Sequence, residues 1–171
     1  WKEQLPEGTI TQENGAHYNV KVVLGEYSGV KGVGALKNSW GADPNHHMGA
    51  ALVHLSPNAT FTLPAVSDTM NRFVLVYKGD GSLQVEDQSM RINDFTDLAG
   101  GEAITFTNGD QDMYMLILEG EPINEPVAAY GPFVMNTQEE LQEAFAEYRR
   151  TEFGGWPWGE TEMDLVNPKD A

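Results

Sequence analysis

The chain has 171 residues, enough for one compact domain with a sizeable core, and its formal net charge is −16. So acidic a surface repels phosphate, which argues against direct binding of nucleic acid or of an anionic membrane. Cysteine is absent, which excludes a disulfide framework, a thiol nucleophile and a thiolate metal site. No apolar run has the length of a membrane span. These features fit a cytoplasmic protein.

The first part of the chain contains little regular structure by its pattern. Residues 1–16 have the composition of a linker or N-terminal arm. A half-buried strand is predicted over residues 18–25, because apolar residues alternate along it. The glycines of residues 29–34 do not have the spacing of a dinucleotide-binding loop, and residues 37–48 have the composition of a loop.

The middle of the chain predicts an all-β fold. Short segments rich in β-branched and aromatic residues alternate with turn signals such as Asn108-Gly109. These segments are residues 51–55, 60–63, 72–77, 82–85, 103–107 and 113–118. A spacing of about ten residues between strands is typical of an antiparallel sandwich or barrel. A double-sheet jelly roll is its natural closed form.

One helix is predicted over residues 137–150. Thr137 and Glu140 have the spacing of a capping box, and Gly154-Gly155 is expected to end the helix. The apolar stripe consists of Leu141, Ala144, Phe145 and Tyr148. Such a stripe usually packs on the body of its own protein and less often docks a partner.

Two stretches of the sequence carry a resemblance to a known family. The first is residues 25–32, GEYSGVKG. The second contains Gly120-Glu121-Pro122, YGPFVMNT at residues 130–137, Glu139-Glu140, and the ending from Tyr148-Arg149 to Phe153-Gly154. Both resemble the second cupin domain of the pirin family. The resemblance implies a cupin-type double-sheet jelly roll with one C-terminal helix for residues 17–154. Residues 155–171 then form an acidic tail that contains tryptophan.

The same resemblance bears on metal binding. It implies that iron is held by three histidines and a glutamate in the first, N-terminal cupin of the family. Quercetin 2,3-dioxygenase activity is attributed to that half in several members. In this chain the His-x-His positions read Leu63-Pro64-Ala65-Val66, and the second motif has Asp112-Met113 where its histidine would stand. We therefore expect no catalytic residue and no cofactor here.

The histidines that the chain does contain are weak metal candidates. His46 and His47 are adjacent in a predicted loop, so their side chains are expected to diverge, and adventitious metal binding is the most that they suggest. His54 lies on a predicted strand and shares a face with Leu52. We interpret it as a hydrogen-bonded residue of the sheet.

One functional hypothesis is structural. The chain is then a metal-free, non-catalytic C-terminal cupin half that offers an interaction surface to the N-terminal cupin half or to a second copy of itself in an oligomer. The candidate interface residues are Pro126, Tyr130, Phe133, Met135, Trp156 and Trp158. Large aromatic side chains carry much of the contact energy of an interface.

The alternative hypothesis is a stand-alone cupin. It binds a small organic ligand inside the barrel, or is a dioxygenase-like enzyme with an unrecognised metal site. The candidate lining residues are Arg72, Tyr77, Tyr114 and Met115, with Arg72 as an anchor for a carboxylate. We favour a barrel filled by side chains, because Phe61, Leu63, Phe73, Leu75, Leu83, Val85, Ile104, Phe106, Leu116 and Leu118 supply enough volume.

Overall fold

The computed structural model describes residues 5–154. The chain divides into two compact units, Trp1–Ile123 and Asn124–Ala171. The first unit and the second unit below are the described parts of these two, residues 5–123 and 124–154.

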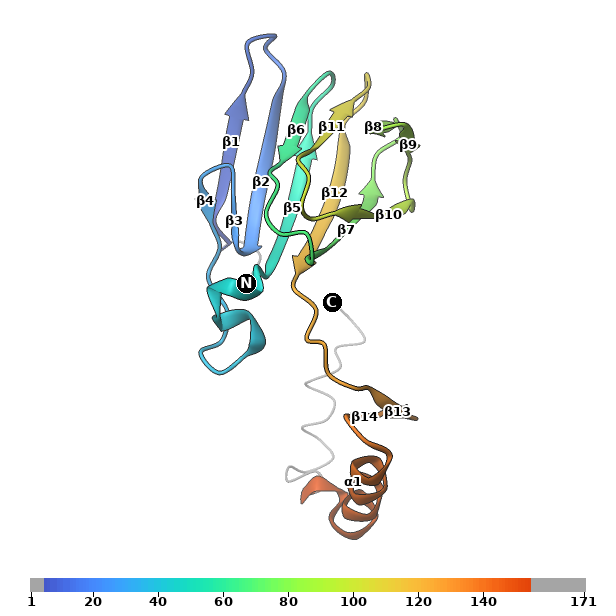
Figure 1. The fold of residues 1–171 in the computed structure, drawn as a ribbon. Coiled ribbons are helices and arrows are strands. Elements are labelled where there is room, and N and C mark those ends of the chain that lie inside the picture. Colours follow the sequence, from blue (N-terminus) through green and yellow to red (C-terminus); the bar gives the residue numbers. More distant parts are fainter. Residues whose placement is uncertain (1–4, 155–171) are drawn as a thin grey trace, which may run out of the picture. The chain divides into compact units, whose positions relative to one another are not determined.

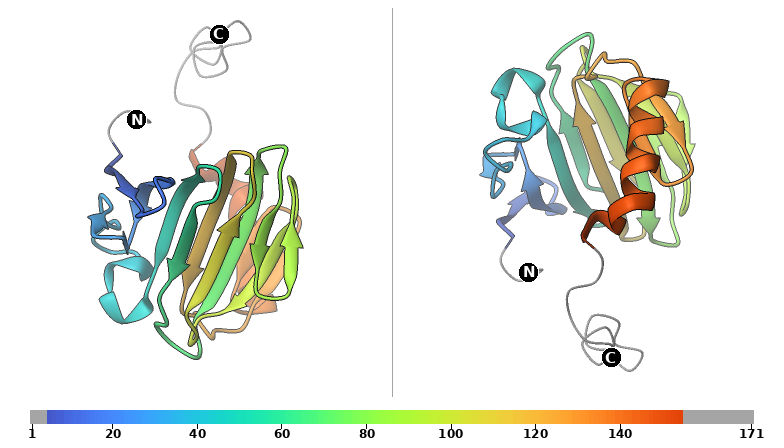
Figure 2. Two further views of the ribbon diagram at one scale, coloured as in Figure 1. Left: turned by 90° about the horizontal axis from the view of Figure 1, so that it is seen from above. Right: turned by 90° about the horizontal axis from the view of Figure 1, so that it is seen from below.

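The first unit is a sandwich of two antiparallel sheets (Figure 1). The six-stranded sheet has the order β1 (Glu7–Thr11), β2 (His17–Leu24), β5 (Gly49–Leu55), β12 (Met113–Gly120), β7 (Asn71–Lys78) and β10 (Phe95–Ala99). The four-stranded sheet has the order β6 (Thr60–Leu63), β11 (Ile104–Asn108), β8 (Leu83–Val85) and β9 (Gln88–Met90). In two further views β5, β12 and β7 run side by side (Figure 2). The prediction of a double-sheet β fold is confirmed.

Shorter elements flank the sandwich. The hairpin of β3 (Glu26–Tyr27) and β4 (Val30–Lys31) follows β2, and two 3₁₀ helices, η2 (Trp40–Ala42) and η3 (Pro44–His46), precede β5. The strand β1 lies inside residues 1–16, which the sequence analysis assigns to a linker or arm. It pairs with β2 from Glu7 opposite Lys21 to Thr11 opposite His17 and forms an edge of the larger sheet.

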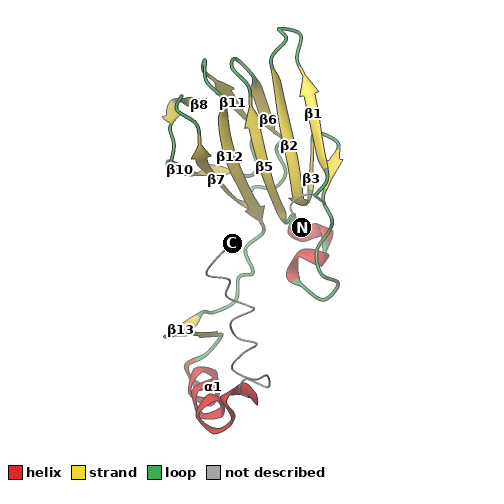
Figure 3. Ribbon diagram, turned by 180° about the vertical axis from the view of Figure 1, so that it is seen from behind, coloured by secondary structure: helices red, strands yellow, loops and turns green. Residues whose placement is uncertain are grey.

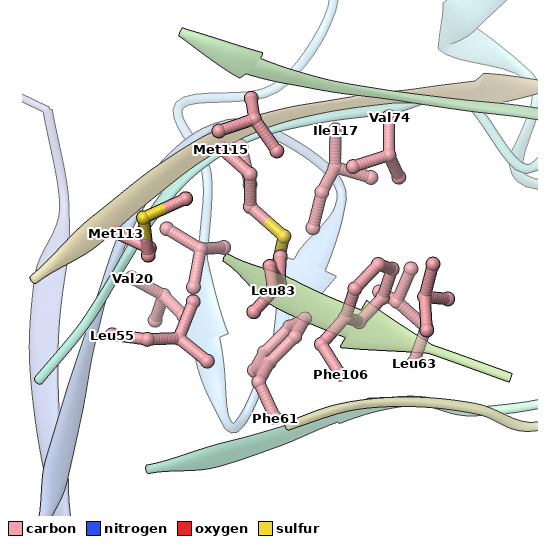
Figure 4. Packing of buried hydrophobic residues seen from close by; sticks show 14 of the residues in the cluster. Val20, Leu55, Phe61, Leu63, Val74, Leu83, Phe106, Met113, Met115 and Ile117 are labelled. Atoms are coloured by element: carbon pink, nitrogen blue, oxygen red, sulfur yellow. The ribbon is translucent and has the colours of Figure 1, made fainter. Parts of the chain in front are cut away.

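The hydrophobic core lies between the two sheets (Figure 4). The larger sheet contributes Val20, Leu55, Met115 and Ile117, and the smaller sheet contributes Phe61, Leu63, Leu83 and Phe106, all of them buried. Burying a side chain of this size contributes about 1.5–3 kcal/mol. The space inside the sandwich is therefore filled by the chain's own apolar side chains.

Two strands present a different face to the core than the sequence analysis expects. Along β7 and β12 the buried residues are Val74, Val76, Met113, Met115 and Ile117. Phe73, Leu75, Leu116 and Leu118, expected inside, lie on the opposite face. Both strands carry large apolar residues at consecutive positions, so an alternating pattern is missing and cannot assign the faces.

The second unit contains the hairpin of β13 (Ala128–Tyr130) and β14 (Phe133–Met135), followed by α1 (Gln138–Thr151) (Figure 3). The capping box is confirmed: the Thr137 hydroxyl accepts from the Glu140 amide, and the Glu140 carboxylate accepts from the Thr137 amide. The helix ends at Thr151, one residue beyond the predicted range of 137–150. Its C-cap is Glu152, which has φ of 50° and donates its amide to the Tyr148 carbonyl, and not the predicted Gly154-Gly155. The short 3₁₀ helix η4 (Glu152–Gly154) follows.

Among residues 5–154, no helix has both the length and the hydropathy that crossing a membrane would require.

Candidate functional site

A buried polar network joins three strands of the first unit. The Tyr27 hydroxyl donates to the Glu119 carboxylate over 2.8 Å, and the Arg72 Nε donates to the other oxygen of Glu119 over 2.7 Å. The Arg72 side chain is fully buried, and that of Glu119 is 10% exposed. Since a buried charge is tolerated only when it is paired, each of these groups depends on the other. We call this the Tyr27–Glu119–Arg72 network.

The glycines of residues 25–32 hold Tyr27 in place. Gly25 has φ of +82°, which favours glycine, and a Cβ at Gly32 would lie 2.7 Å from the carbonyl oxygen of Val23. A Cβ at Gly49 would collide with the Tyr27 hydroxyl. The motif that carries the family resemblance thus lets the β3–β4 hairpin fold tightly onto β2 and β5.

The surroundings of the network show why it is structural. Burial first, and then the negative charge of Glu119, raise the pKa of Tyr27 far above its usual range, so its hydroxyl stays protonated and donates. The Arg72 guanidinium also donates to the backbone carbonyls of Pro64, Ala99 and Glu102. These bonds occupy the donors that the sequence analysis assigns to a ligand carboxylate.

A second polar cluster lies at the end of β12. Glu121 accepts hydrogen bonds from the Thr69 hydroxyl at 2.6 Å and pairs with His47 Nδ1 at 3.0 Å. Hydrogen bonds from Ser67, Thr69 and His47, in that order, lower the pKa of Glu121 to about 2. Nearby, His46 stacks on Trp40 with ring centroids 3.5 Å apart.

The two adjacent histidines therefore diverge, as predicted. His46 Nδ1 bonds the Trp40 carbonyl, while His47 bonds Glu121.

A cavity of about 700 Å³ adjoins His47. Its lining includes Leu24, Lys31, Lys37, Met48 and Met70.

The six-stranded sheet has a second apolar surface on the side away from the core, which we call the outer face. Cross-strand pairing aligns Leu52 of β5, Leu116 of β12, Leu75 of β7 and Phe95 of β10 in one row. Leu118 and Phe73 stand beside each other in the next row. Phe95 is 66% exposed and Leu118 is 42% exposed. These six residues define the apolar rows of the outer face.

One end of the outer face is aromatic and basic. His54 stacks on Tyr114 with ring centroids 4.5 Å apart, and the Lys78 ammonium lies 4.5 Å from the centre of the Tyr114 ring. Tyr77 lies beside Tyr114, with centroids 6.1 Å apart. A cavity of about 570 Å³ opens here, and its lining also includes Lys21. We call it the aromatic–basic pocket.

The four residues proposed to line the barrel interior lie on opposite faces. Arg72 and Met115 are buried inside the sandwich. Tyr77 and Tyr114 do not line the interior and belong to the outer face, where both line the aromatic–basic pocket. Side chains alternate along a strand, so Tyr114 and Met115 cannot share a face. A ligand-binding role for these residues stays a prediction.

Two of the interface residues proposed in the second unit, Tyr130 and Phe133, belong to an aromatic cluster. Phe133 contacts Phe145, Tyr148 and Phe153, with ring centroids 4.7, 6.0 and 5.9 Å apart, and Tyr130 contacts Phe145 at 5.6 Å. Tyr130 is 72% exposed. Pro126 is exposed and Met135 is half-buried. Trp156 and Trp158 lie outside the described residues.

The described residues do not fit the iron site that the family resemblance implies for the other cupin. Among residues 5–154, no group of three or more His, Asp or Glu side chains is placed to hold a metal ion. The interior is lined by apolar side chains such as Phe61, Leu63 and Phe106, and its buried cation is Arg72. Arg72 is a permanent cation that is already paired with Glu119, whereas an iron site needs imidazole and carboxylate donors.

Sequence reasoning missed the partners of Arg72. Tyr27 lies in one stretch that carries the family resemblance and Glu119 directly precedes the other, but nothing in their spacing links them. An arginine at the start of an otherwise apolar strand was the available signal, because a buried arginine requires a carboxylate.

Comparisons with known proteins agree with this architecture. Residues 50–154 match the model of the pirin C-terminal cupin domain. A putative quercetin 2,3-dioxygenase of Vibrio cholerae is 40% identical over 83 residues, which cover 48% of this chain and 28% of that protein. Human pirin is 30% identical over 103 residues, which cover 58% of this chain and 35% of that protein.

A solved structure extends the match. The quercetin 2,3-dioxygenase of Acinetobacter baumannii superposes with a TM-score of 0.66 at 28% identity, over 89% of this chain and 48% of that one. The chain therefore spans about half of that enzyme and about a third of the curated relatives named above.

Proposed function

The chain belongs to the pirin family through its C-terminal cupin domain, and from this premise we propose that it is the structural half of a two-cupin assembly. In this proposal it offers the outer face to an N-terminal cupin half and carries no metal-dependent step itself. The activity named for the relatives, quercetin 2,3-dioxygenation, then belongs to the other half.

The outer face is the observation that carries the proposal. An antiparallel sheet with one face in the core usually presents polar side chains on its other face. Here β12 is apolar on both sides, with Met115 and Ile117 toward the core and Leu116 and Leu118 on the outer face. The edge strand β10 adds the exposed Phe95 to the same outer face. Contiguous apolar surface of this kind marks an interaction site.

An N-terminal cupin half is the occupant that fits best. The chain superposes on 48% of the Acinetobacter dioxygenase. The remaining half of that enzyme is therefore a natural model for the partner. A second copy fits less well, because two chains of net charge −16 repel each other. The filled interior of the sandwich supports the non-catalytic part of the proposal.

The test is association in trans. The chain is mixed with the N-terminal cupin half of the Vibrio cholerae relative, and complex formation is followed by sedimentation velocity. We expect a one-to-one complex that Leu116→Asp abolishes, because a carboxylate on the apolar rows would be buried without a partner. The matched control is Leu36→Asp, which places the same charge on a leucine that is 83% exposed and outside the outer face.

Three results contradict the proposal. A complex that tolerates Leu116→Asp contradicts the choice of face. If the chain forms a homodimer that Leu116→Asp dissociates, a second copy of the chain covers the outer face, and not an N-terminal cupin half. One tightly bound iron per purified chain, found by elemental analysis, contradicts the non-catalytic role.

A further inference from the structure

The aromatic–basic pocket is a feature that docking of a cupin half does not explain. It occupies the end of the outer face where β1 and β2 meet β5, and its lining is polar and aromatic. We infer that it binds a small planar aromatic molecule that carries one carboxylate. This inference goes beyond the proposed function and holds for the isolated chain.

The size and the floor of the pocket suit an aromatic ring. Its volume of about 570 Å³ falls within the usual range of ligand sites. Leu52 lines it together with the Tyr77 ring, which is 39% exposed. A flat ring packed on these groups removes apolar and aromatic surface from water on both partners.

The Lys78 ammonium lies beside this apolar and aromatic surface. The Lys78 ammonium lies over the Tyr114 ring, and within the described part of the chain no carboxylate comes within salt-bridge distance of it. Acidic residues outnumber lysine and arginine by 26 to 10 in this chain. An ammonium held on an aromatic ring without such a partner is therefore a group to which an incoming carboxylate can bind.

The acidic groups around the pocket have partners of their own. Glu7 accepts from the Lys21 ammonium at 2.7 Å, and this hydrogen bond lowers the pKa of Glu7. Asp112 lies 2.7 Å from His54 Nε2. These two carboxylates still disfavour a ligand with a double negative charge, which is why the geometry points to a monocarboxylate and not to a phosphate ester.

The experiment uses three related probes with the whole chain. Naphthalene-2-carboxylate has the ring and the charge, naphthalene-2-methanol has the ring alone, and cyclohexanecarboxylate has the charge alone. Titration calorimetry is expected to show binding of the first probe, with both others weaker. 2-Naphthyl phosphate is expected to bind more weakly than the carboxylate at a pH where it is doubly charged.

Variants assign the binding to this pocket. Lys78→Met should weaken naphthalene-2-carboxylate about tenfold, because it removes the cation and keeps the length of the side chain. Lys37→Met is the matched control. It removes the same charge from an exposed lysine that lines the cavity beside His47, and it should leave the affinity for naphthalene-2-carboxylate unchanged. Tyr77→Leu should weaken both naphthalene probes, and thermal unfolding checks that each variant is folded.

Four results overturn the inference. The first is that naphthalene-2-carboxylate shows no binding up to its solubility limit, and the second is that the neutral alcohol binds with equal affinity. The third is that Lys78→Met leaves the affinity for naphthalene-2-carboxylate unchanged. The fourth is that Leu116→Asp abolishes binding of this probe while Lys78→Met and Tyr77→Leu do not. The last result would place the probe on the apolar rows.

Discussion

The two faces of the six-stranded sheet have similar compositions and different environments. The inner face presents Val53, Met115 and Ile117, which are fully buried under the four-stranded sheet. The outer face presents Leu52, Leu116 and their row, which remain partly exposed. An apolar strand pattern therefore indicates how much surface must be covered. Which part of the chain or which partner covers it follows only from the three-dimensional structure.

The two faces also differ in where their charged side chains lie. The inner side contains one ion pair, Arg72 with Glu119, closed off from water. The outer side carries Lys21, Lys78 and His54, which are partly exposed or exposed and placed among aromatic rings. An internal pair of this kind fixes the fold, whereas a surface group remains available to a partner or ligand.

The largest effect is expected for the buried ion pair. Arg72→Ala leaves the Glu119 carboxylate without its cation in a site that is 10% exposed, and it should lower the free energy of unfolding by about 3–5 kcal/mol. Denaturant titration measures the change. Arg91→Ala, at an exposed arginine, is the matched control and should stay within about 0.5 kcal/mol. A loss below about 1 kcal/mol for Arg72→Ala would mean that the pair is open to water.

The next effect compares the faces directly through two neighbouring residues. Ile117→Ala opens a cavity in the core and should cost about 2–5 kcal/mol of unfolding free energy. Leu116→Ala, one position earlier on the outer face, should cost clearly less in the isolated chain, because that side chain is already partly exposed. The same denaturant titration serves both variants. Equal losses would show that the outer face is covered in the isolated chain too.

The smallest effect concerns Glu121, just beyond β12. Folding lowers its pKa from a usual value of 4.5 to about 2, so the folded state favours the charged carboxylate. This contribution to stability is present above about pH 4.5 and is lost as the pH falls toward 2. Glu121→Gln should therefore be less stable than the unmodified chain near neutral pH, and the gap should close in acid.

Thermal unfolding between pH 2 and 7 measures this gap. Glu13→Gln, at an exposed carboxylate, is the control for the general change in net charge. A gap of constant size across this range would show that Glu121 acts through packing and not through its charge.

The sequence predicted the parts of the fold that depend on local signals. The capping box at Thr137 and Glu140 is local chemistry within one turn, and the strand positions follow from runs of β-branched residues between turns. The assignment of faces along β7 and β12 failed, because consecutive large apolar residues carry no period of two. The strand β1 was missed, since its EGTIT sequence is too polar to stand out.

The candidate site was less predictable for a physical reason. Its members meet only through tertiary pairing: His54, Tyr114 and Lys78 come from three strands and face one another through cross-strand register. A register shift between Tyr114 and Met115 also brings both Tyr77 and Lys78 close to Tyr114. Sequence alone gives no register between distant strands. The sequence did predict His54 as a hydrogen-bonded sheet residue, which its contact with Asp112 confirms.

The hydrogen bond between Tyr27 and Glu119 has a kinetic consequence. These residues are 92 positions apart in the chain, so their contact closes a loop that includes most of the strands of the first unit. Closing so long a loop costs chain entropy, which disfavours this contact until the strands between the two residues have assembled. We therefore expect this bond to form after the transition state for folding, where it acts as a latch. Its loss would then shorten the lifetime of the folded unit and leave the rate of refolding almost unchanged.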